Sequence, residues 1–490
     1  MGAGRPQMKQ INEIYRPIER PIRIAQFGEG NFLRAFADWM IDIANESGDF
    51  AGNIAVIKPR AHGDLDAFRA QDCLYTVQLR GAEADGQPLV SSRVVRSIGA
   101  ALNPYRDAQA LWALARSEEL HFVISNTTES GIEFRADDPF PGDGLSLTFP
   151  GKLTQLLMRR FEHFGGGHGL IMLPTELNDR NGDLLRDCVM RYSRAWGLGA
   201  EFERWVEEEC VFACTLVDRI VTGYPRDEAD AIERELGYHD ALLTTGEPFA
   251  LWVFETPRDI SAELPLDRAG LPVVFTRDIR PYKERKVRLL NGAHTSSVHA
   301  AYLAGCRTVL DMMRDETMRR FIEGFMFDEA AGCVPLPADE ARAFAGSVLE
   351  RFANPYVRHQ LLSISLNSFA KWRARLLPTL KDNVSRGALP RRTAFSLAAM
   401  LSFYTGERTG EGYFGQSADG PYPISDDERV IDAVSAACRL DARGYAHAIL
   451  AREDFWGEDL TRIAGLEDAV ASALERIRSV GMRRAVEELG

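Results

Sequence analysis

The run Ile22-Arg-Ile-Ala-Gln-Phe27, followed directly by Gly28-Glu-Gly30-Asn-Phe-Leu-Arg34, sets the architecture of the N-terminal half of the chain. Its first six residues are short, largely apolar and end at a glycine, which predicts a buried β-strand. Apolar residues then recur at helical spacing from Phe32 to Asn45, and Ile54–Ile57 is a second buried-strand candidate. A strand, a glycine turn, a helix and a second strand predict a right-handed βαβ unit and therefore a parallel sheet.

Further along the chain the same alternation continues and then stops. Phe122–Ser125 and Leu170–Leu173 are two more buried-strand candidates, and Leu74–Leu79 with Leu89–Val95 flank a Gly-rich turn, which predicts a hairpin. From about Tyr282 onward, amphipathic helical patterns run to the end with little β signal, and the Gly-rich segment 406–423 is expected to be a loop.

The expected fold class is therefore a Rossmann-type α/β domain with a mainly parallel sheet, followed by an all-α C-terminal domain. We expect residues 1–280 to form the dinucleotide-binding domain and residues 281–490 to form the helical substrate and catalytic domain.

The glycine turn is the first candidate site. Gly28 and Gly30 allow a tight turn and let the backbone approach a pyrophosphate at the start of the following helix, although Leu33 stands where a third glycine is usual. The second strand ends at Lys58, with Arg60 close behind and no acid before Asp64 to grip a ribose 2′-hydroxyl, so these residues leave NAD and NADP both open. The expected cofactor-binding residues here are Phe27, Gly28, Glu29, Gly30, Asn31, Phe32 and Lys58.

Composition excludes several classes of function. In 490 residues, 58 basic against 71 acidic side chains give a net charge of −13, which argues against nucleic acid as a partner but not against an anionic small substrate. No apolar run is long enough to span a membrane, and the opening MGAGRPQMKQ lacks an apolar core, so we expect a cytoplasmic protein. The seven scattered cysteines have no zinc spacing, so we expect reduced thiols and no metal site, and no protein partner is evident.

The second candidate site begins at Tyr282 and reads Tyr-Lys-Glu-Arg-Lys286-Val-Arg-Leu-Leu-Asn291-Gly-Ala-His294. Ketone reduction needs a proton for the developing alkoxide and donors for the carbonyl oxygen, and a lysine, an asparagine and a histidine supply them. On an α-helix these three side chains span an arc of roughly 140° at about 100° per residue, which is loose for a site. A solvated basic helix face is the plain alternative, and Tyr282 with Lys286 also forms the Y-x-x-x-K pair of short-chain dehydrogenases.

Several motifs together resemble the mannitol dehydrogenase family of long-chain polyol dehydrogenases. They are KVRLLNGAH, the GEGNFLRA turn and the Val217–Ile220 segment VDRI, joined by QFGEGNFLRAFADWMID, SNTTESGI, PTELNDRNGD, NPYVRHQLLSISLN and LAAMLSFYTGER. These segments span residues 26 to 408. Within the family the match is closest to members that reduce tagaturonate.

The resemblance implies roles for individual residues. The family pattern K-x4-N-x2-H falls on Lys286 as the general acid/base, Asn291 as the group that polarises the carbonyl, and His294 as the group that orients the substrate. It implies NAD as the cofactor, adds Thr127 and Asp218 to the cofactor-binding set, and implies no catalytic metal. The family also places an asparagine where this chain has Leu177, so either Asn178 takes that part or the donor is lost.

The segment His359–Arg375 is the expected substrate-binding region. Its polar residues His359, Ser363, Asn367, Lys371 and Arg375 follow one another at i+4, with a solvated helix stripe as the alternative. In polyol-oxidising relatives a lysine matching Lys371 binds substrate hydroxyls and an arginine stands at the place of Ser363, which suggests a remodelled pocket. Cationic side chains there suit a substrate carboxylate. The expected substrate-binding residues are Asn178, Arg358, His359, Lys371 and Arg373, with Arg375 as a further candidate.

The resemblance implies a sugar-acid substrate and NAD(H)-linked reduction of D-tagaturonate to D-altronate. Reduction of fructuronate to mannonate is the nearest alternative, because the two ketones differ only in the configuration of a hydroxyl. Oxidation of mannitol or another polyol comes third, and a silent nucleotide- or sugar-acid-binding protein is the alternative from another class.

Overall fold

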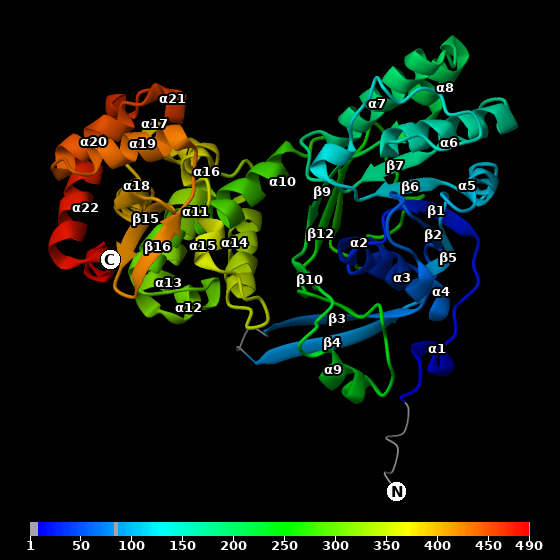
Figure 1. Ribbon diagram of the computed structural model, residues 1–490, viewed down its shortest axis with the longest axis horizontal. Coiled ribbons are helices and arrows are strands. Elements are labelled where there is room, and N and C mark those ends of the chain that lie inside the picture. The colour runs from blue at the N-terminus through cyan, green and yellow to red at the C-terminus, as the bar shows by residue number, and fades with distance from the viewer. Residues whose placement is uncertain (1–7, 83–86, 490) are drawn as a thin grey trace, which may run out of the picture. The chain divides into compact units, whose positions relative to one another are not determined.

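The computed structural model describes residues 8–82 and 87–489 (Figure 1). The chain divides into two compact units, the first ending at Ile279 and the second beginning at Arg280, against an expected boundary after residue 280. The tip of the expected hairpin, residues 83–86, and the first seven residues of the N-terminal stretch lie outside the described residues.

A six-stranded parallel sheet organises the first unit. Its order is β5 (Ile98–Leu102), β2 (Asn53–Ile57), β1 (Ile22–Phe27), β6 (Phe122–Ser125), β7 (Ile171–Pro174) and β8 (Val211–Phe212). The chain thus winds outward from β1 first in one direction and then in the other, which is the order of dinucleotide-binding folds. This confirms the expected Rossmann-type sheet.

Alternate residues of these strands face two different cores. Ile24, Ile54 and Phe122 pack against α3 (Ala37–Ser47) on one side. Their neighbours Ala25 and Val123 pack on the other side, under four helices: α5 (Ala108–Ala115), α6 (Phe149–Phe164), α7 (Asn181–Trp196) and α8 (Ala200–Glu209). Figure 1 shows α3 and α6 on opposite sides of the sheet. Burial on both faces explains why these strands read as continuous apolar runs.

The expected helix from Phe32 to Asn45 is interrupted. A short helix α2 (Asn31–Arg34) follows Gly30, and α3 starts only after Phe36, whose φ of −128° and ψ of −85° are not helical. The helical apolar spacing runs through the break because Phe36 itself is fully buried and packs on Trp252 at 5.2 Å between ring centroids. The expectation of one helix was therefore wrong.

Two smaller sheets complete the first unit. One has the order β10 (Val221–Gly223), β11 (Thr244–Gly246), β3 (Tyr75–Ala82) and β4 (Pro88–Val95), and the other has the order β13 (Val273–Thr276), β12 (Leu251–Glu255) and β9 (Cys214–Asp218). The remaining helices are α1 (Ile11–Ile14), α4 (Asp66–Ala70) and α9 (Ala229–Leu236).

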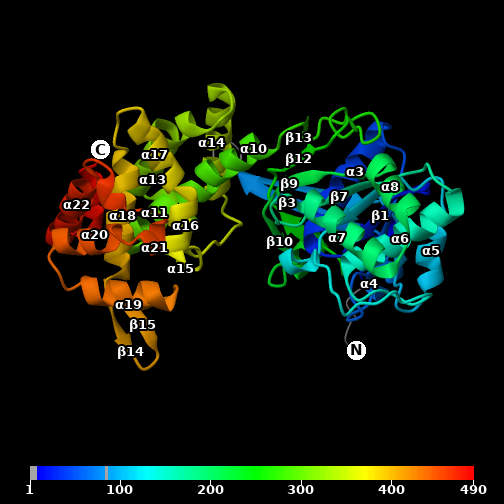
Figure 2. The same cartoon turned by 90° about the horizontal axis from the view of Figure 1, so that it is seen from above.

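One continuous helix runs through the centre of the second unit. It comprises α10 (Arg280–Arg285), a π-helical segment (Lys286–Asn291) and α11 (Gly292–Leu303). In Figure 2, α11 lies among its neighbours, and it packs against α13 (Glu316–Gly324), α15 (Leu361–Ile364), α16 (Ser368–Arg375) and α18 (Arg391–Tyr404). Its buried hydroxyls donate to carbonyls three or four residues back, so small polar residues suit a helix enclosed on nearly all sides.

The rest of the second unit is helical apart from one small sheet. The helices are α12 (Val309–Arg314), α14 (Ala338–Phe352), α17 (Leu377–Ser385), α19 (Glu428–Ala437), α20 (Ala442–Leu450), α21 (Glu453–Trp456), α22 (Leu466–Val480) and α23 (Met482–Glu487). The Gly-rich segment expected as a loop instead forms an antiparallel sheet of β14 (Gly406–Thr409), β15 (Gly412–Ser417) and β16 (Gly420–Ile424). Its buried Tyr413 and Tyr422 donate hydroxyl hydrogen bonds to the Tyr404 and Phe403 carbonyls, which anchors the sheet to α18.

The cysteines and the length of the helices bear on two further expectations. All seven cysteines are free. Within residues 8–82 and 87–489, no helix combines the length and the apolarity needed to span a bilayer.

Candidate active site

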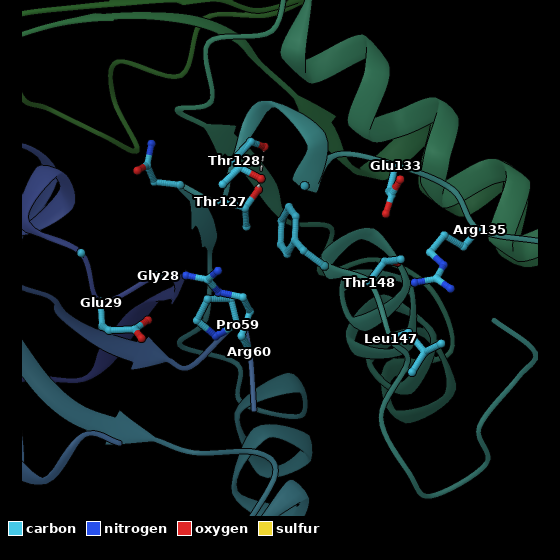
Figure 3. A pocket seen from close by; sticks show the side chains of 14 residues that line it. Gly28, Glu29, Pro59, Arg60, Thr127, Thr128, Glu133, Arg135, Leu147 and Thr148 are labelled. Carbon is cyan, nitrogen blue, oxygen red and sulfur yellow. Dashed lines mark hydrogen bonds between the residues drawn. The ribbon is translucent and has the colours of Figure 1, made fainter. Parts of the chain in front are cut away.

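A crevice lies at the carboxyl ends of β1 and β6, where the strand order of the parallel sheet reverses. We call it the nucleotide crevice, because such a switch point is where open α/β sheets bind nucleotides. Its volume is about 330 Å³. Figure 3 shows Glu29 and Arg60 on one side and Glu133 and Arg135 on another, with Thr127 near the end of β6. The lining residues are Gly28, Glu29, Gly30, Pro59, Arg60, Asn126, Thr127, Thr128, Gly131, Glu133, Arg135, Leu147, Thr148 and Phe149.

The two glycines of the turn have different reasons for being glycine. Gly28 has φ of +141°, and a Cβ there would lie 3.0 Å from the Leu33 side chain and 3.2 Å from the Asn126 carbonyl oxygen. A Cβ at Gly30 would meet nothing within 4 Å, so Gly30 leaves open space on the crevice wall. The turn is therefore packed against the protein at Gly28 and open at Gly30, where the pyrophosphate of a nucleotide can approach the protein backbone.

A buried carboxylate, Glu176, holds the opposite wall of the crevice. Its Oε1 accepts hydrogen bonds from the backbone N–H and the hydroxyl of Thr127, both at 2.9 Å, and its Oε2 accepts one from Ser125 at 3.0 Å. Burial raises the pKa of Glu176, and the hydrogen bonds partly offset that rise. Sequence reasoning missed this residue, although the signal was present: an acid two residues beyond the last residue of a buried strand, at the carboxyl edge of a parallel sheet.

The expected cofactor residues separate into two groups. Gly28, Glu29, Gly30 and Thr127 line the nucleotide crevice. The other expected residues do not line it: Phe27 packs on Phe149, Phe32 stacks on Phe36, Asn31 bonds to Arg34, Lys58 is buried, and Asp218 is buried at the end of β9.

The charge of Lys58 is paired within the protein. Its ammonium donates to Glu29 Oε1 at 3.1 Å, and its side chain is only 3% exposed. Arg60, three residues beyond the end of β2, is exposed and lines the crevice, so its guanidinium is accessible to a ligand.

In the second unit, a π-helical segment begins at Lys286 and ends at Asn291, two of the catalytic candidates. The Gly292 N–H donates to the Val287 carbonyl, five residues back. This bonding over five residues widens the turn, so Lys286 and Asn291 lie closer in angle around the helix axis than they would on an α-helix. The arc expected from the sequence assumed α-helical geometry throughout, which this segment does not have.

The neighbouring basic residues are not a solvated face. Arg285 pairs with Glu340 at 2.7 Å and Arg288 pairs with Asp382 at 2.5 Å, and their side chains are 7% and 12% exposed. Tyr282, the partner in the alternative Y-x-x-x-K pair, lies against the Arg285 guanidinium at 5.3 Å. Arg285 and Arg288 thus anchor the helix on either side of Lys286, which is half-buried.

His294 lies three residues beyond Asn291, and the charges of Arg375, Arg351 and Lys371 act on it. Its ring stacks on Phe352 at 4.2 Å and meets the edge of His359 at 5.3 Å. Its Nε2 is shielded from solvent and has no hydrogen-bond partner. Burial, followed by the charges of His359 and Arg375, lowers the pKa of His294 well below its ordinary value.

Two residues of α16, Lys371 and Arg375, contribute to this positive charge. Lys371 donates to the Ile364 carbonyl at 2.9 Å, and Arg375 donates to Thr295 Oγ1 at 3.1 Å. Thr295 in turn donates to the Asn291 carbonyl at 2.9 Å, which ties Arg375 to the turn of the catalytic candidates. We call Lys371 and Arg375, together with the neighbouring imidazoles of His294 and His359, the cationic cluster.

The other expected substrate residues take no part in these contacts. Arg358 is exposed, and Arg373 is exposed and points at Gly457. Asn178 belongs to the first unit, where its amide donates to the Glu129 carbonyl at 2.9 Å while Oδ1 is shielded and unpartnered. The expected helix over His359–Arg375 is also broken, because Asn367 adopts φ of +53° between α15 and α16.

Comparison with protein families matches nearly the whole chain. The model described as "Mannitol dehydrogenase Rossmann domain" matches residues 22–268, and "Mannitol dehydrogenase C-terminal domain" matches residues 278–478. The altronate oxidoreductase of Enterobacter sp. (strain 638) is 43% identical over 478 residues, covering 96% of this chain and 97% of that protein. The altronate oxidoreductase of Escherichia coli O7:K1 is 43% identical over 492 residues, covering 98% of this chain and 100% of that protein.

Solved structures agree in fold. A Pseudomonas fluorescens mannitol 2-dehydrogenase, in a ternary complex with NAD and D-mannitol, is 23% identical with a TM-score of 0.67, covering 99% of this chain and 97% of that one. A D-sorbitol dehydrogenase in substrate-free form is 21% identical with a TM-score of 0.79, covering 98% and 100% of the two chains. With both domain models matched in order and relatives at 43% identity over the full length, this chain belongs to the mannitol dehydrogenase family.

Proposed function

We propose that this chain is an NAD(H)-dependent reductase that converts the ketone of D-tagaturonate into the secondary alcohol of D-altronate, reversibly and without a metal ion. Family membership makes it an oxidoreductase that acts on CH–OH groups. The substrate follows from the full-length relatives, which are altronate oxidoreductases. The observation that supports the mechanism is the π-helical segment from Lys286 to Asn291, in which these two residues lie closer in angle than on an α-helix.

The first unit is the dinucleotide-binding domain in this proposal. The Gly28–Gly30 turn, open on its ligand side, receives the pyrophosphate, and Thr127 holds its place on the facing wall through Glu176. NAD is the cofactor in the related mannitol 2-dehydrogenase complex, and the crevice at the switch point suits it. When bound, the nicotinamide ring supplies or accepts the hydride.

The second unit carries the acid–base chemistry. Lys286 donates a proton to the oxygen of the reduced carbonyl and takes it back in the oxidative direction. The Asn291 amide, one π-turn away, donates to the same oxygen and stabilises its developing charge. Because Lys286 supplies the proton, the proposed reaction needs no metal ion.

His294 orients the substrate. With its pKa lowered, the imidazole is neutral at neutral pH, so it offers one N–H donor and one acceptor nitrogen to a substrate hydroxyl. The unpartnered, shielded Nε2 is the atom we assign to this contact. A neutral ring also avoids adding a further charge beside Lys371 and Arg375.

A direct absorbance assay with purified protein tests the proposal. NADH and NADPH are each mixed with D-tagaturonate, D-fructuronate and D-fructose, and the near-ultraviolet absorbance of the reduced cofactor is followed. We expect the highest kcat/KM with NADH and tagaturonate. Preference for fructuronate or fructose would assign the sister reaction or a polyol dehydrogenase instead, and turnover of none would favour a binding protein.

A further inference from the structure

Arg375 is a half-buried arginine without an acidic partner. Its one hydrogen bond among the described residues goes to Thr295, a neutral hydroxyl, and no carboxylate of residues 8–82 or 87–489 lies within ion-pair distance. Other shielded arginines of the same unit are neutralised, Arg285 by Glu340 and Arg288 by Asp382. Arg375 therefore differs from Arg285 and Arg288.

A second cation stands one helical turn away. Lys371 and Arg375 are four residues apart on α16, a spacing at which like charges repel. Asp426, an acid whose charge acts on Lys371, already accepts hydrogen bonds from the Tyr404 hydroxyl at 2.6 Å and the Phe369 N–H at 3.3 Å. Two partly buried cations held together without an anion are costly for the free protein, and an anionic ligand would offset that cost.

The Arg375 guanidinium is also oriented toward the catalytic turn. Thr295 Oγ1 accepts from Arg375 and donates to the Asn291 carbonyl, so two hydrogen bonds join the guanidinium to the residue assigned to the ketone. Only one of its five N–H donors is used in this contact, and a guanidinium fork matches a carboxylate. Lys371 uses one of its three N–H donors on the Ile364 carbonyl and has no planar fork to match a carboxylate.

We propose that Arg375, oriented by Thr295, binds the carboxylate of the substrate and makes the enzyme select sugar acids over neutral ketoses. This assignment rests on the proposed function. The substrate it implies carries a carboxylate at the end of its carbon chain remote from the ketone. Lys371 adds positive potential at the same site.

The test compares two ketones that differ only at that carboxylate. D-Tagaturonate and D-tagatose are reduced by the wild type, by Arg375→Met, by Arg375→Lys and by Arg439→Met, an exposed arginine after α19 as the control. We expect Arg375→Met to lower kcat/KM for tagaturonate by at least about 30-fold, mainly through KM, and to leave tagatose within about 3-fold. Arg375→Lys should recover part of the loss because the charge remains but the fork does not.

A binding measurement separates this inference from the proposed reaction. D-Altronate should raise the Tm of the wild type and of Arg439→Met, and this rise should be lost in Arg375→Met. If tagaturonate is not turned over, the proposed function fails while the Tm shift still decides the role of Arg375. Equal losses for both ketones, or an undiminished altronate shift in Arg375→Met, would overturn the inference.

Discussion

The nucleotide crevice of the first unit and the cationic cluster of the second treat their charged groups in opposite ways. In the crevice, Glu176 is buried but satisfied by three hydrogen bonds, and Lys58 is paired with Glu29. In the cluster, Lys371 and Arg375 face no acid within ion-pair distance among the described residues, and His294 keeps an unpartnered nitrogen.

The difference separates two kinds of recognition. In the crevice, Glu176 and Lys58 already have hydrogen-bond partners before a ligand binds. The crevice therefore recognises a ligand by its shape and through the accessible backbone at Gly30. A cluster of unpaired charge instead gains its partner only from the ligand, so it selects by charge. We therefore expect changes in the crevice to alter cofactor affinity, and changes in the cluster or its neighbouring turn to alter chemistry and substrate choice.

Lys286→Ala should have the largest effect. Removing the proton donor should lower kcat by about 1000-fold, while the affinity for NADH, measured by fluorescence titration, should change by less than about 2-fold. Tyr282→Phe is the matched control on the same helix, and we expect it to keep most of the activity because Tyr282 packs on Arg285. Unchanged turnover in Lys286→Ala would refute the mechanism, and a dead Tyr282→Phe would favour the Y-x-x-x-K pair.

Glu176→Ala should come next and should act on the cofactor. It leaves the Thr127 N–H and the Ser125 hydroxyl without their acceptor, which costs about 1–3 kcal/mol per buried group. We expect KM for NADH to rise by about 10- to 100-fold, with KM for tagaturonate nearly constant. Glu176→Gln keeps one oxygen acceptor and should recover part of the loss. A parallel rise of both KM values would mean that Glu176 supports the fold generally and not the crevice.

The sequence predicted the skeleton of both regions better than their details. Strands buried on both faces, such as β1 and β6, have an unmistakable apolar run, so the parallel sheet and the glycine turn could be read directly. The split between α2 and α3 could not, because Phe36 keeps the helical spacing while its backbone leaves the helix. The segment 406–423 looked like a loop from its glycines, although Tyr413 and Tyr422 were the signal for a packed sheet.

The candidate residues follow the same rule. Lys286 and Asn291 looked badly spaced because α-helical geometry was assumed, and no local propensity announces a π-turn. Glu176 was overlooked because glutamates are mostly exposed, and only three long-range hydrogen bonds make a buried one acceptable. The likeness to a known family supplied the roles of Lys286 and Asn291 where spacing alone did not.

Acid should affect the two units in opposite directions. His299 in α11 is fully buried, and burial lowers its pKa to about 3. Between pH 6.5 and 3 this histidine is therefore protonated in the unfolded chain and neutral in the folded unit. Each pH unit of acidification in that window should cost the second unit about 1.4 kcal/mol from this group. In the first unit, burial raises the pKa of Asp38 to about 7, so folding takes up a proton and this contribution grows as the pH falls from 7 to 3.8.

Calorimetry at several pH values tests this contrast. On going from pH 7 to pH 5, the melting transition of the second unit should fall relative to that of the first. His299→Gln should flatten the fall, because glutamine does not titrate and can still bond to Ser368. Parallel pH profiles for the wild type and His299→Gln would show that His299 does not govern the acid response.

Arg60→Ala should have the smallest effect, and it addresses the cofactor choice that the sequence left open. Arg60 is exposed on the crevice, whereas Lys58, the other cation at the end of β2, is held by Glu29. An exposed charge contributes at most about 1 kcal/mol to an ion pair, so loss of Arg60 should weaken the binding of NADPH by about 5-fold at most. NADH, which has no 2′-phosphate, should change by less than about 2-fold. The ratio of KM values for the two cofactors is the measurement, and equal changes for both would mean that Arg60 contacts a part of the nucleotide that they share.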